Sequence, residues 1–140
     1  MNWMIPPEED MTAIAKVNEK AAGYGLTLTE EEMALLAESR GRALRDTGRV
    51  EVGGGILPRL METFCDSPYL HQAEYPETLE VLQTLFYRCK NEAGDLTADE
   101  TVLRYLRRAF DKAGGSASYL EGKTYGEMVA WLKEGETWND

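Results

Sequence analysis

Apolar residues recur along most of this chain at spacings of three and four, which is the period of an amphipathic α-helix. Glycine and proline interrupt the pattern between the periodic stretches, so each stretch has a recognisable beginning and end. The pattern predicts about six helices, over residues 7–22, 29–48, 56–65, 75–91, 97–113 and 124–132.

Three of the predicted helices begin with the same chemistry. A threonine is followed three residues later by a glutamate, so that the hydroxyl accepts a hydrogen bond from a backbone N–H and the carboxylate reaches back to the threonine N–H. The three pairs are Thr29 and Glu32, Thr97 and Glu100, and Thr124 and Glu127.

Two short segments, residues 24–28 and 49–52, alternate polar and apolar side chains instead. Alternation is typical of a strand with one buried face, so the two either pair as a minimal ribbon or serve as extended links. We therefore expect a mainly α, compact bundle of about six helices in a single domain over residues 1–140, with or without one short two-stranded β element. Residues 1–6 and 134–140 are expected to be loosely ordered.

Three consecutive glycines, Gly53, Gly54 and Gly55, precede the third predicted helix. Glycine adopts positive φ and lets another segment come close, so the triplet favours a hinge that leads into a buried helix. The functional alternative is an anion site, in which Arg59 and the backbone N–H groups at the helix start face a phosphate. No phosphate-loop motif follows the triplet, and the nearby Glu51 would repel such an anion.

Composition and charge narrow the functional classes. The formal net charge of −10 is spread along the chain, which argues against nucleic-acid binding because that requires a positive footprint. No apolar run approaches the roughly 20 residues that span a bilayer, and the N-terminus lacks a signal-peptide pattern. We therefore expect a cytoplasmic protein that binds neither nucleic acid nor membrane.

The only histidine, His71, lies near Cys65 and Asp66 in the sequence. A thiol activated by an imidazole that a carboxylate orients is a nucleophile, so these three are the candidates for a catalytic site. The alternative is that Cys65 fills the core as a reduced thiol while His71 lies in a solvated loop. One histidine and two separated cysteines give no metal-ligand spacing, and we predict neither a metal nor a cofactor.

Two kinds of surface suit a protein partner. Tyr69 and Tyr75 lie in the proline-rich centre, where tyrosines favour recognition but also serve as the edge of a core. Arg104 and Arg108 share one face of the fifth predicted helix, where they either dock an acidic partner or pair with nearby carboxylates. The predicted binding residues are Gly53, Gly54, Gly55, Arg59, Tyr69, Tyr75, Arg104 and Arg108.

Four sequence strings form a specific combination. They are VEVGGGILP at residues 50–58, FCDSPY at 64–69, ETL at 77–79 and FYRCKNE at 86–92. With these strings the chain resembles a bacterial family of unknown function, domain-of-unknown-function family 6323, over roughly residues 26–132. The resemblance implies a cytoplasmic bacterial protein and carries no activity with it.

These observations predict a non-enzymatic function. We expect a cytoplasmic bacterial protein that contacts an unidentified protein partner, as an interaction or accessory module, through residues 53–75 or through the arginine face. Two alternatives stay open: a small-ligand-binding protein or thiol enzyme that uses residues 53–71, and an acidic inhibitor that mimics nucleic acid. The sequence is compatible with a monomer or a small homo-oligomer.

Overall fold

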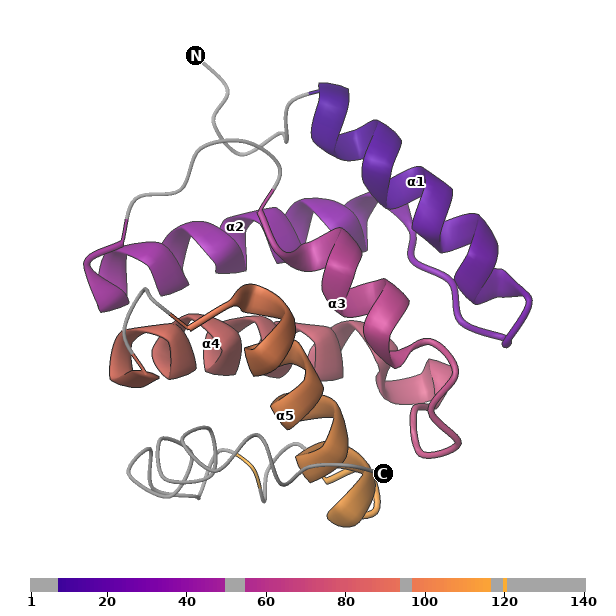
Figure 1. Cartoon of the computed structure of the whole chain (residues 1–140). Coiled ribbons are helices and arrows are strands. Elements are labelled where there is room, and N and C mark those ends of the chain that lie inside the picture. The colour runs from indigo at the N-terminus through magenta and orange to yellow at the C-terminus, as the bar shows by residue number, and fades with distance from the viewer. Residues whose placement is uncertain (1–7, 50–54, 94–96, 117–119, 121–140) are drawn as a thin grey trace.

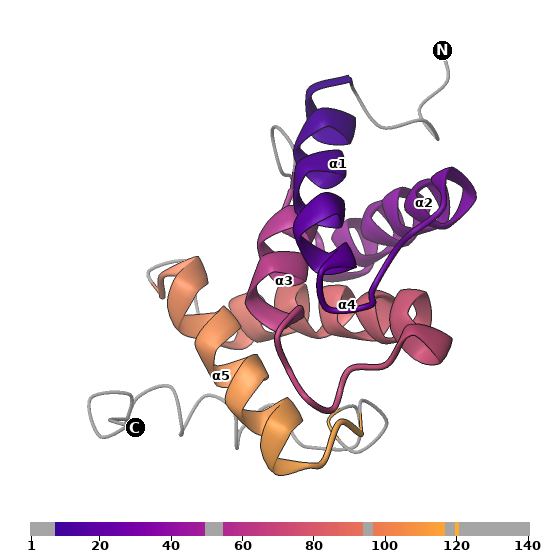
Figure 2. The same cartoon turned by 90° about the vertical axis from the view of Figure 1, so that its right-hand side faces the viewer.

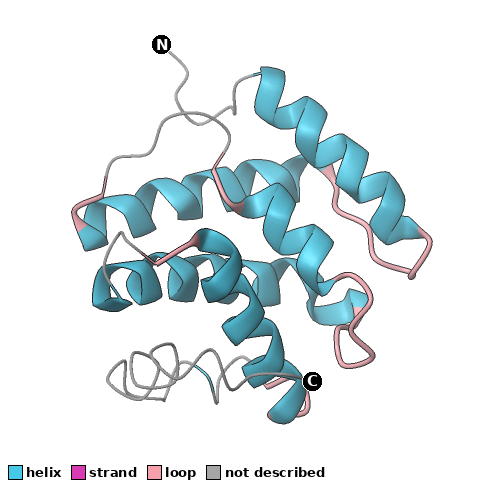
Figure 3. Ribbon diagram, in the orientation of Figure 1, coloured by secondary structure: helices cyan, strands magenta, loops and turns pink. Residues whose placement is uncertain are grey.

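A computed structural model of the chain describes residues 8–49, 55–93, 97–116 and 120. This part is helical and contains no strand, which confirms the mainly α fold class (Figure 3). The elements in chain order are α1 (Glu8–Ala22), α2 (Glu30–Thr47), α3 (Leu57–Phe64), the 3₁₀ turn η1 (Gln72–Glu74), α4 (Tyr75–Ala93) and α5 (Asp99–Lys112).

Several expectations fall outside the described residues. They concern the sixth predicted helix at residues 124–132, its capping pair, and the order of residues 1–6 and 134–140. The described chain therefore contains five of the predicted α-helices, each within a few residues of its predicted bounds. None of these five has the length and apolar character needed to cross a bilayer.

The helices form two layers. α2 and α4 lie side by side in one layer; in the other, α3 and α5 pack against α4, and α1 packs against α3 (Figure 1). The view turned by 90° separates the layers, with α1, α3 and α5 stacked from top to bottom (Figure 2). Because α4 packs against α2, α3 and α5, it is the central element, and most of its circumference is buried.

The core between the layers is made by the apolar faces that the sequence pattern predicts. All four apolar residues of the α3 face, Leu57, Leu60, Met61 and Phe64, are buried. Phe64 meets Phe110 of α5 edge-on, with ring centroids 5.4 Å apart, which is a favoured arrangement of two aromatic rings. Burial of its apolar face in the core therefore stabilises the short α3 more than its own helix propensity does.

The first predicted capping box is confirmed. The Glu32 N–H donates to Thr29 Oγ1 at 3.1 Å, and the Thr29 N–H donates to Glu32 Oε1 at 2.9 Å. At the other end of α2, Gly48 closes the helix in the left-handed conformation with φ +68°.

The second predicted capping box is wrong. α5 begins at Asp99 with Ala98 as its N-cap residue, and no side chain caps it. Lys90 of α4 accounts for the difference, because its buried ammonium donates to the Thr97 carbonyl and forms an ion pair with Asp99 at 3.0 Å. A tertiary contact with α4 therefore sets the start of α5, in place of the predicted local capping box.

Of the segment 24–28, predicted as a strand or an extended link, Tyr24 and Gly25 instead belong to the turn that closes α1. Side-chain amides hold the residues that follow. Leu28 donates its N–H to Asn18 Oδ1 at 3.0 Å and accepts from Asn18 Nδ2 at 3.2 Å. On the opposite edge, Thr27 donates to Gln72 Oε1 at 2.6 Å and accepts from Gln72 Nε2 at 3.1 Å. The predicted pairing partner of residues 24–28 is the segment 49–52. Except for Arg49, this segment lies outside the described residues, so the two-stranded ribbon stays a prediction.

We predict that Asn18→Ala lowers the free energy of unfolding by about 2 kcal/mol, because two partly buried backbone groups of Leu28 lose their partners. Gln72→Ala is the matched control, with an expected loss below about 1 kcal/mol because water replaces its exposed amide. Urea unfolding of both variants measures the two losses. Equal losses would contradict the difference in burial.

Candidate functional site

Cys65, the candidate nucleophile, lies in the core at the end of α3. It is only 2% exposed, and its Sγ donates to the Glu62 carbonyl oxygen at 3.6 Å. Burial raises the pKa of the Cys65 thiol above its usual value, which disfavours the thiolate. A catalytic thiol needs the opposite shift, so this environment supports a core role for the residue.

Asp66, the proposed orienting carboxylate, instead accepts from Arg107 of α5 at 2.6 Å. The same guanidinium donates to the Thr63 carbonyl at 2.8 Å and to Asp111 Oδ2 at 2.7 Å. The other carboxylate oxygen of Asp111 accepts from Ser67 Oγ at 2.7 Å. This set of contacts, here called the Arg107 network, binds the loop after α3 to α5.

The Arg107 network fixes the position of Tyr69. The Tyr69 N–H donates to Ser67 Oγ at 3.2 Å, so the hydroxyl that Asp111 holds also orders the next turn of the loop. The loop then lies directly on the end of α5, where a Cβ added to Gly115 would come within 2.7 Å of the Tyr69 carbonyl oxygen. Gly115 also has φ +87°, so both the close approach of Tyr69 and the left-handed backbone favour glycine at this position.

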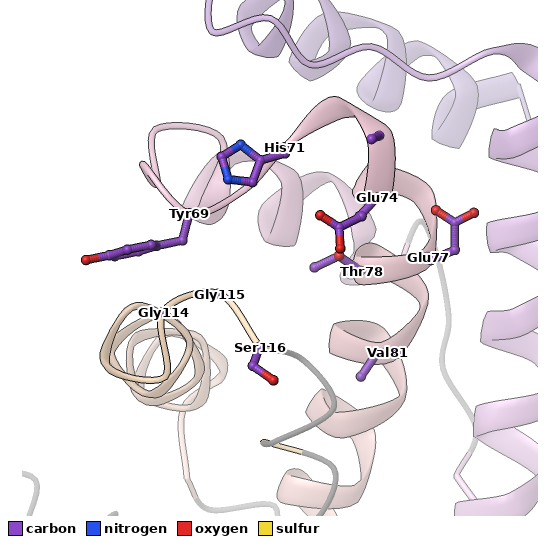
Figure 4. Close-up of a pocket in the computed structure, with 10 residues that line it drawn as sticks. Tyr69, His71, Glu74, Glu77, Thr78, Val81, Gly114, Gly115 and Ser116 are labelled. Carbon is purple, nitrogen blue, oxygen red and sulfur yellow. The ribbon is translucent and has the colours of Figure 1, made fainter.

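A cavity of about 610 Å³ opens beside this loop. Figure 4 shows Tyr69 and His71 along one wall, the residues after α5 opposite, and Glu74, Thr78 and Val81 on a third side. The lining residues are Tyr69, His71, Ala73, Glu74, Glu77, Thr78, Val81, Gly114, Gly115 and Ser116. This cavity is the candidate functional site.

The cavity divides the residues that the sequence grouped together. His71 is exposed and lines it, as does Tyr69, which is 43% exposed. Cys65 and Asp66 are not among its lining residues. Within the described residues, no three His, Cys, Asp or Glu side chains are grouped so that they could hold a metal ion.

Sequence reasoning did not select Glu74, Glu77 and Thr78, although all three line the cavity. Acidic residues at the start of a helix ordinarily interact favourably with the helix dipole, so their pattern in the sequence assigns them no other role. The site could have been recognised only from the tertiary arrangement, in which the end of α5 lies opposite α4.

Tyr75, one of the predicted binding residues, lies in the core. Its side chain is fully buried, and its hydroxyl has no hydrogen-bond partner among the described residues. Burial raises the pKa of the phenol well above its ordinary range. Tyr75 therefore anchors the start of α4 and does not present a surface.

Of the glycine triplet, only Gly55 lies within the described residues, and Gly53 and Gly54 lie outside them. Gly55 has φ +74°, and a Cβ built on it would overlap the side chain of Arg40. The position thus combines a left-handed backbone with the close approach of a side chain from α2, the use of glycine that the hinge interpretation expects.

The predicted arginines differ in their surroundings. Arg59 forms ion pairs with Asp99 at 3.4 Å and Glu100 at 3.2 Å, which tie α3 to the first turn of α5. Arg104 is exposed and Arg108 is half-buried. Neither Arg59 nor this arginine face lines the cavity.

We predict slow labelling of Cys65 by a chromogenic disulfide reagent in the variant Cys89→Ala, which leaves Cys65 as the sole thiol. The rate should be at least about 100-fold below that of the unfolded chain, because the reagent reaches the thiol only after local opening. With the pKa raised, the rate should climb between pH 6 and 8 without a plateau. Fast labelling that levels off below pH 7 would identify an activated thiolate.

We predict that Gly115→Ala destabilises the fold by about 2–4 kcal/mol, because it adds a clash with the Tyr69 carbonyl to the strain of a left-handed residue. Gly114→Ala isolates the strain, since Gly114 has φ +68° and open space around it; its expected cost is about 1 kcal/mol. Urea unfolding compares the two. If Gly115→Ala costs no more than Gly114→Ala, the loop does not lie against α5 as described.

Comparison with known proteins identifies a family. The sequence matches the family of unknown function DUF6323 over residues 13–138, nearly the whole chain. No curated protein and no solved structure matches. The match confirms the resemblance that the four sequence strings carry, and the chain belongs to the family of unknown function DUF6323.

Proposed function

We propose that this chain is a non-enzymatic module of the bacterial cytoplasm that binds a protein partner, and that the cavity beside the loop 66–70 is its contact surface. The observation that carries the proposal is a hollow whose wall is held in place by the Arg107 network. A wall fixed before binding lowers the entropy lost when a partner binds.

The exposed side chain at the rim supports the same proposal. Tyr69 combines a large apolar ring with a polar tip, and tyrosines of this kind are enriched at protein interfaces. The backbone that carries it is ordered by Ser67 and Asp111, so little conformational freedom is left to lose on binding.

The buried environment of Cys65 supports the non-enzymatic part of the proposal. The thiol lies in the core with a raised pKa, and its neighbour Asp66 is engaged by Arg107. In this arrangement neither residue is prepared for nucleophilic chemistry.

Binding of a small molecule in the same cavity is the second candidate function. The volume of about 610 Å³ lies within the range of roughly 300–1,000 Å³ that ligand sites occupy. The mouth of the cavity carries exposed side chains such as Tyr69 and His71, which favours a protein partner over a small molecule.

We predict that a photo-crosslinking amino acid at position 69 forms a covalent adduct with one partner protein in cells. The same amino acid at position 24 is the matched control, because Tyr24 is also exposed and lies outside the cavity. Ala73→Trp, which fills the cavity, should lower the adduct yield about tenfold or more. Ala22→Trp, an exposed site at the end of α1, should not.

Gel electrophoresis and mass spectrometry measure the adducts. Equal adducts at positions 69 and 24, or an adduct that Ala73→Trp leaves unchanged, would overturn the proposed contact surface.

A further inference from the structure

A groove follows the seam between α2 and α4, the two helices that lie side by side in one layer (Figure 1). Two hollows of about 200 and 220 Å³ lie along it, and Arg42 and Glu80 line both. These two side chains pair at 3.2 Å, so one ion pair across the seam separates the hollows. The two hollows together are here called the α2–α4 groove. It shares only Glu77 and Val81 with the cavity beside the loop, so it is a second concave surface.

The first hollow of the α2–α4 groove has an exposed apolar wall. Leu35 is 62% exposed, the highest fraction among the large hydrophobic side chains of the described residues. A single exposed leucine is ordinary on a flat surface, but Leu35 lines a hollow together with Leu36 and Pro76. Apolar side chains that line a hollow can receive the buried anchor residue of a partner. The first hollow is therefore suited to a large apolar side chain.

The rim of the same groove is acidic. The charged residues that line it are Glu32, Asp46, Glu77, Glu80 and Arg42. Arg42 is already engaged by two carboxylates, Glu80 and, at 3.0 Å, Glu38. Neither Asp46 nor Glu77 forms an ion pair with a described residue, and the Glu77 carboxylate points away from the cavity (Figure 4). A rim of this sign is complementary to lysine and arginine side chains.

The spacing of the two hollows matches a helix. Leu35 and Ala43, one from each hollow, are eight residues apart on α2, and Pro76 and Thr84 are eight apart on α4. At a rise of about 1.5 Å per residue, the hollows lie about 12 Å apart. Two turns of a helix cover about 11 Å and return a side chain to the same face. The groove presents side chains and no strand edge, which favours a helix in the groove over an added strand.

We infer that the α2–α4 groove docks an amphipathic, basic helix of a partner protein. A large apolar side chain of that helix enters the hollow beside Leu35, a second side chain two turns away enters the other hollow, and lysine or arginine residues face Glu77 and Asp46. The inference goes beyond the proposed function and does not depend on it, because the groove and the cavity are different surfaces.

The test places a photo-crosslinking amino acid at position 46 of the full chain in cells, an exposed site in the second hollow. Mass spectrometry of the adduct should identify one partner segment with large apolar residues seven or eight apart and at least two lysines or arginines. A segment without this pattern or an adduct with a second copy of this chain would overturn the inference. So would a yield no higher than that at position 24, which lies outside the groove.

Variants in the other hollow separate docking from chance proximity. Leu35→Glu should lower the adduct yield at position 46 about tenfold, because the apolar anchor of the partner loses its contact. Leu35→Met keeps an apolar side chain of similar size and should leave the yield within about twofold. Tyr24→Glu makes the matched change at another exposed position outside the groove. If Tyr24→Glu lowers the yield as much as Leu35→Glu does, the groove is not the docking site.

A charge reversal tests the basic character of the partner helix. Glu77→Lys should lower the yield at position 46 about threefold, because it places a like charge beside the lysines or arginines of the partner. Glu19→Lys changes the net charge equally at an exposed position of α1 and should leave the yield within about 1.5-fold. Equal effects of the two reversals would leave only general attraction and would overturn the basic helix.

The adducts at positions 46 and 69 distinguish this inference from the proposed function. Loss of the position 46 adduct alone overturns the docking of a helix in the α2–α4 groove, and loss of the position 69 adduct alone overturns the contact surface at the cavity. The four variants alter exposed side chains, so thermal unfolding should show an unchanged fold.

Discussion

The guanidinium of Arg107 joins two parts of the chain that are more than forty residues apart in sequence, the end of α3 with the loop after it and α5 itself. It donates to the carbonyl of Thr63 near the end of α3, to Asp66 in the loop and to Asp111 on its own helix. Charge-assisted hydrogen bonds of this kind are the strong ones, and the planar fork of arginine lets one side chain serve several acceptors. Because Asp111 also holds Ser67, the loop cannot leave α5 without breaking all these contacts. The wall of the cavity depends on this one side chain.

Much of the fold could be predicted because its signals are local. The helix periods, the capping box at Thr29 and the closure at Gly48 each depend on a few neighbouring residues. The start of α5 could not be predicted from such signals. There Lys90, an ordinary charged residue in the sequence, is buried and engages the helix start, and Ala98 becomes the N-cap residue.

Less of the candidate site could be predicted, because its residues meet only through tertiary contacts. The string FCDSPY indicated a segment that shapes the backbone, and its Asp66 and Ser67 do bind a helix more than forty residues away. The sequence could not show which helix that is. Nor could it show that Tyr75 points into the core while Tyr69 stays exposed, since both are tyrosines beside prolines. Residues 74–78 resemble an ordinary acidic helix start.

The extended segment after α1 has a consequence for how the protein behaves in a crowded cell. A short extended stretch with free N–H and C=O groups is a template on which a second chain can add a strand, which leads to aggregation. Here the backbone groups of Thr27 and Leu28 point to opposite edges, and Gln72 and Asn18 occupy one edge each. Two amide side chains thus take the place of neighbouring strands and close both edges to intermolecular β-pairing.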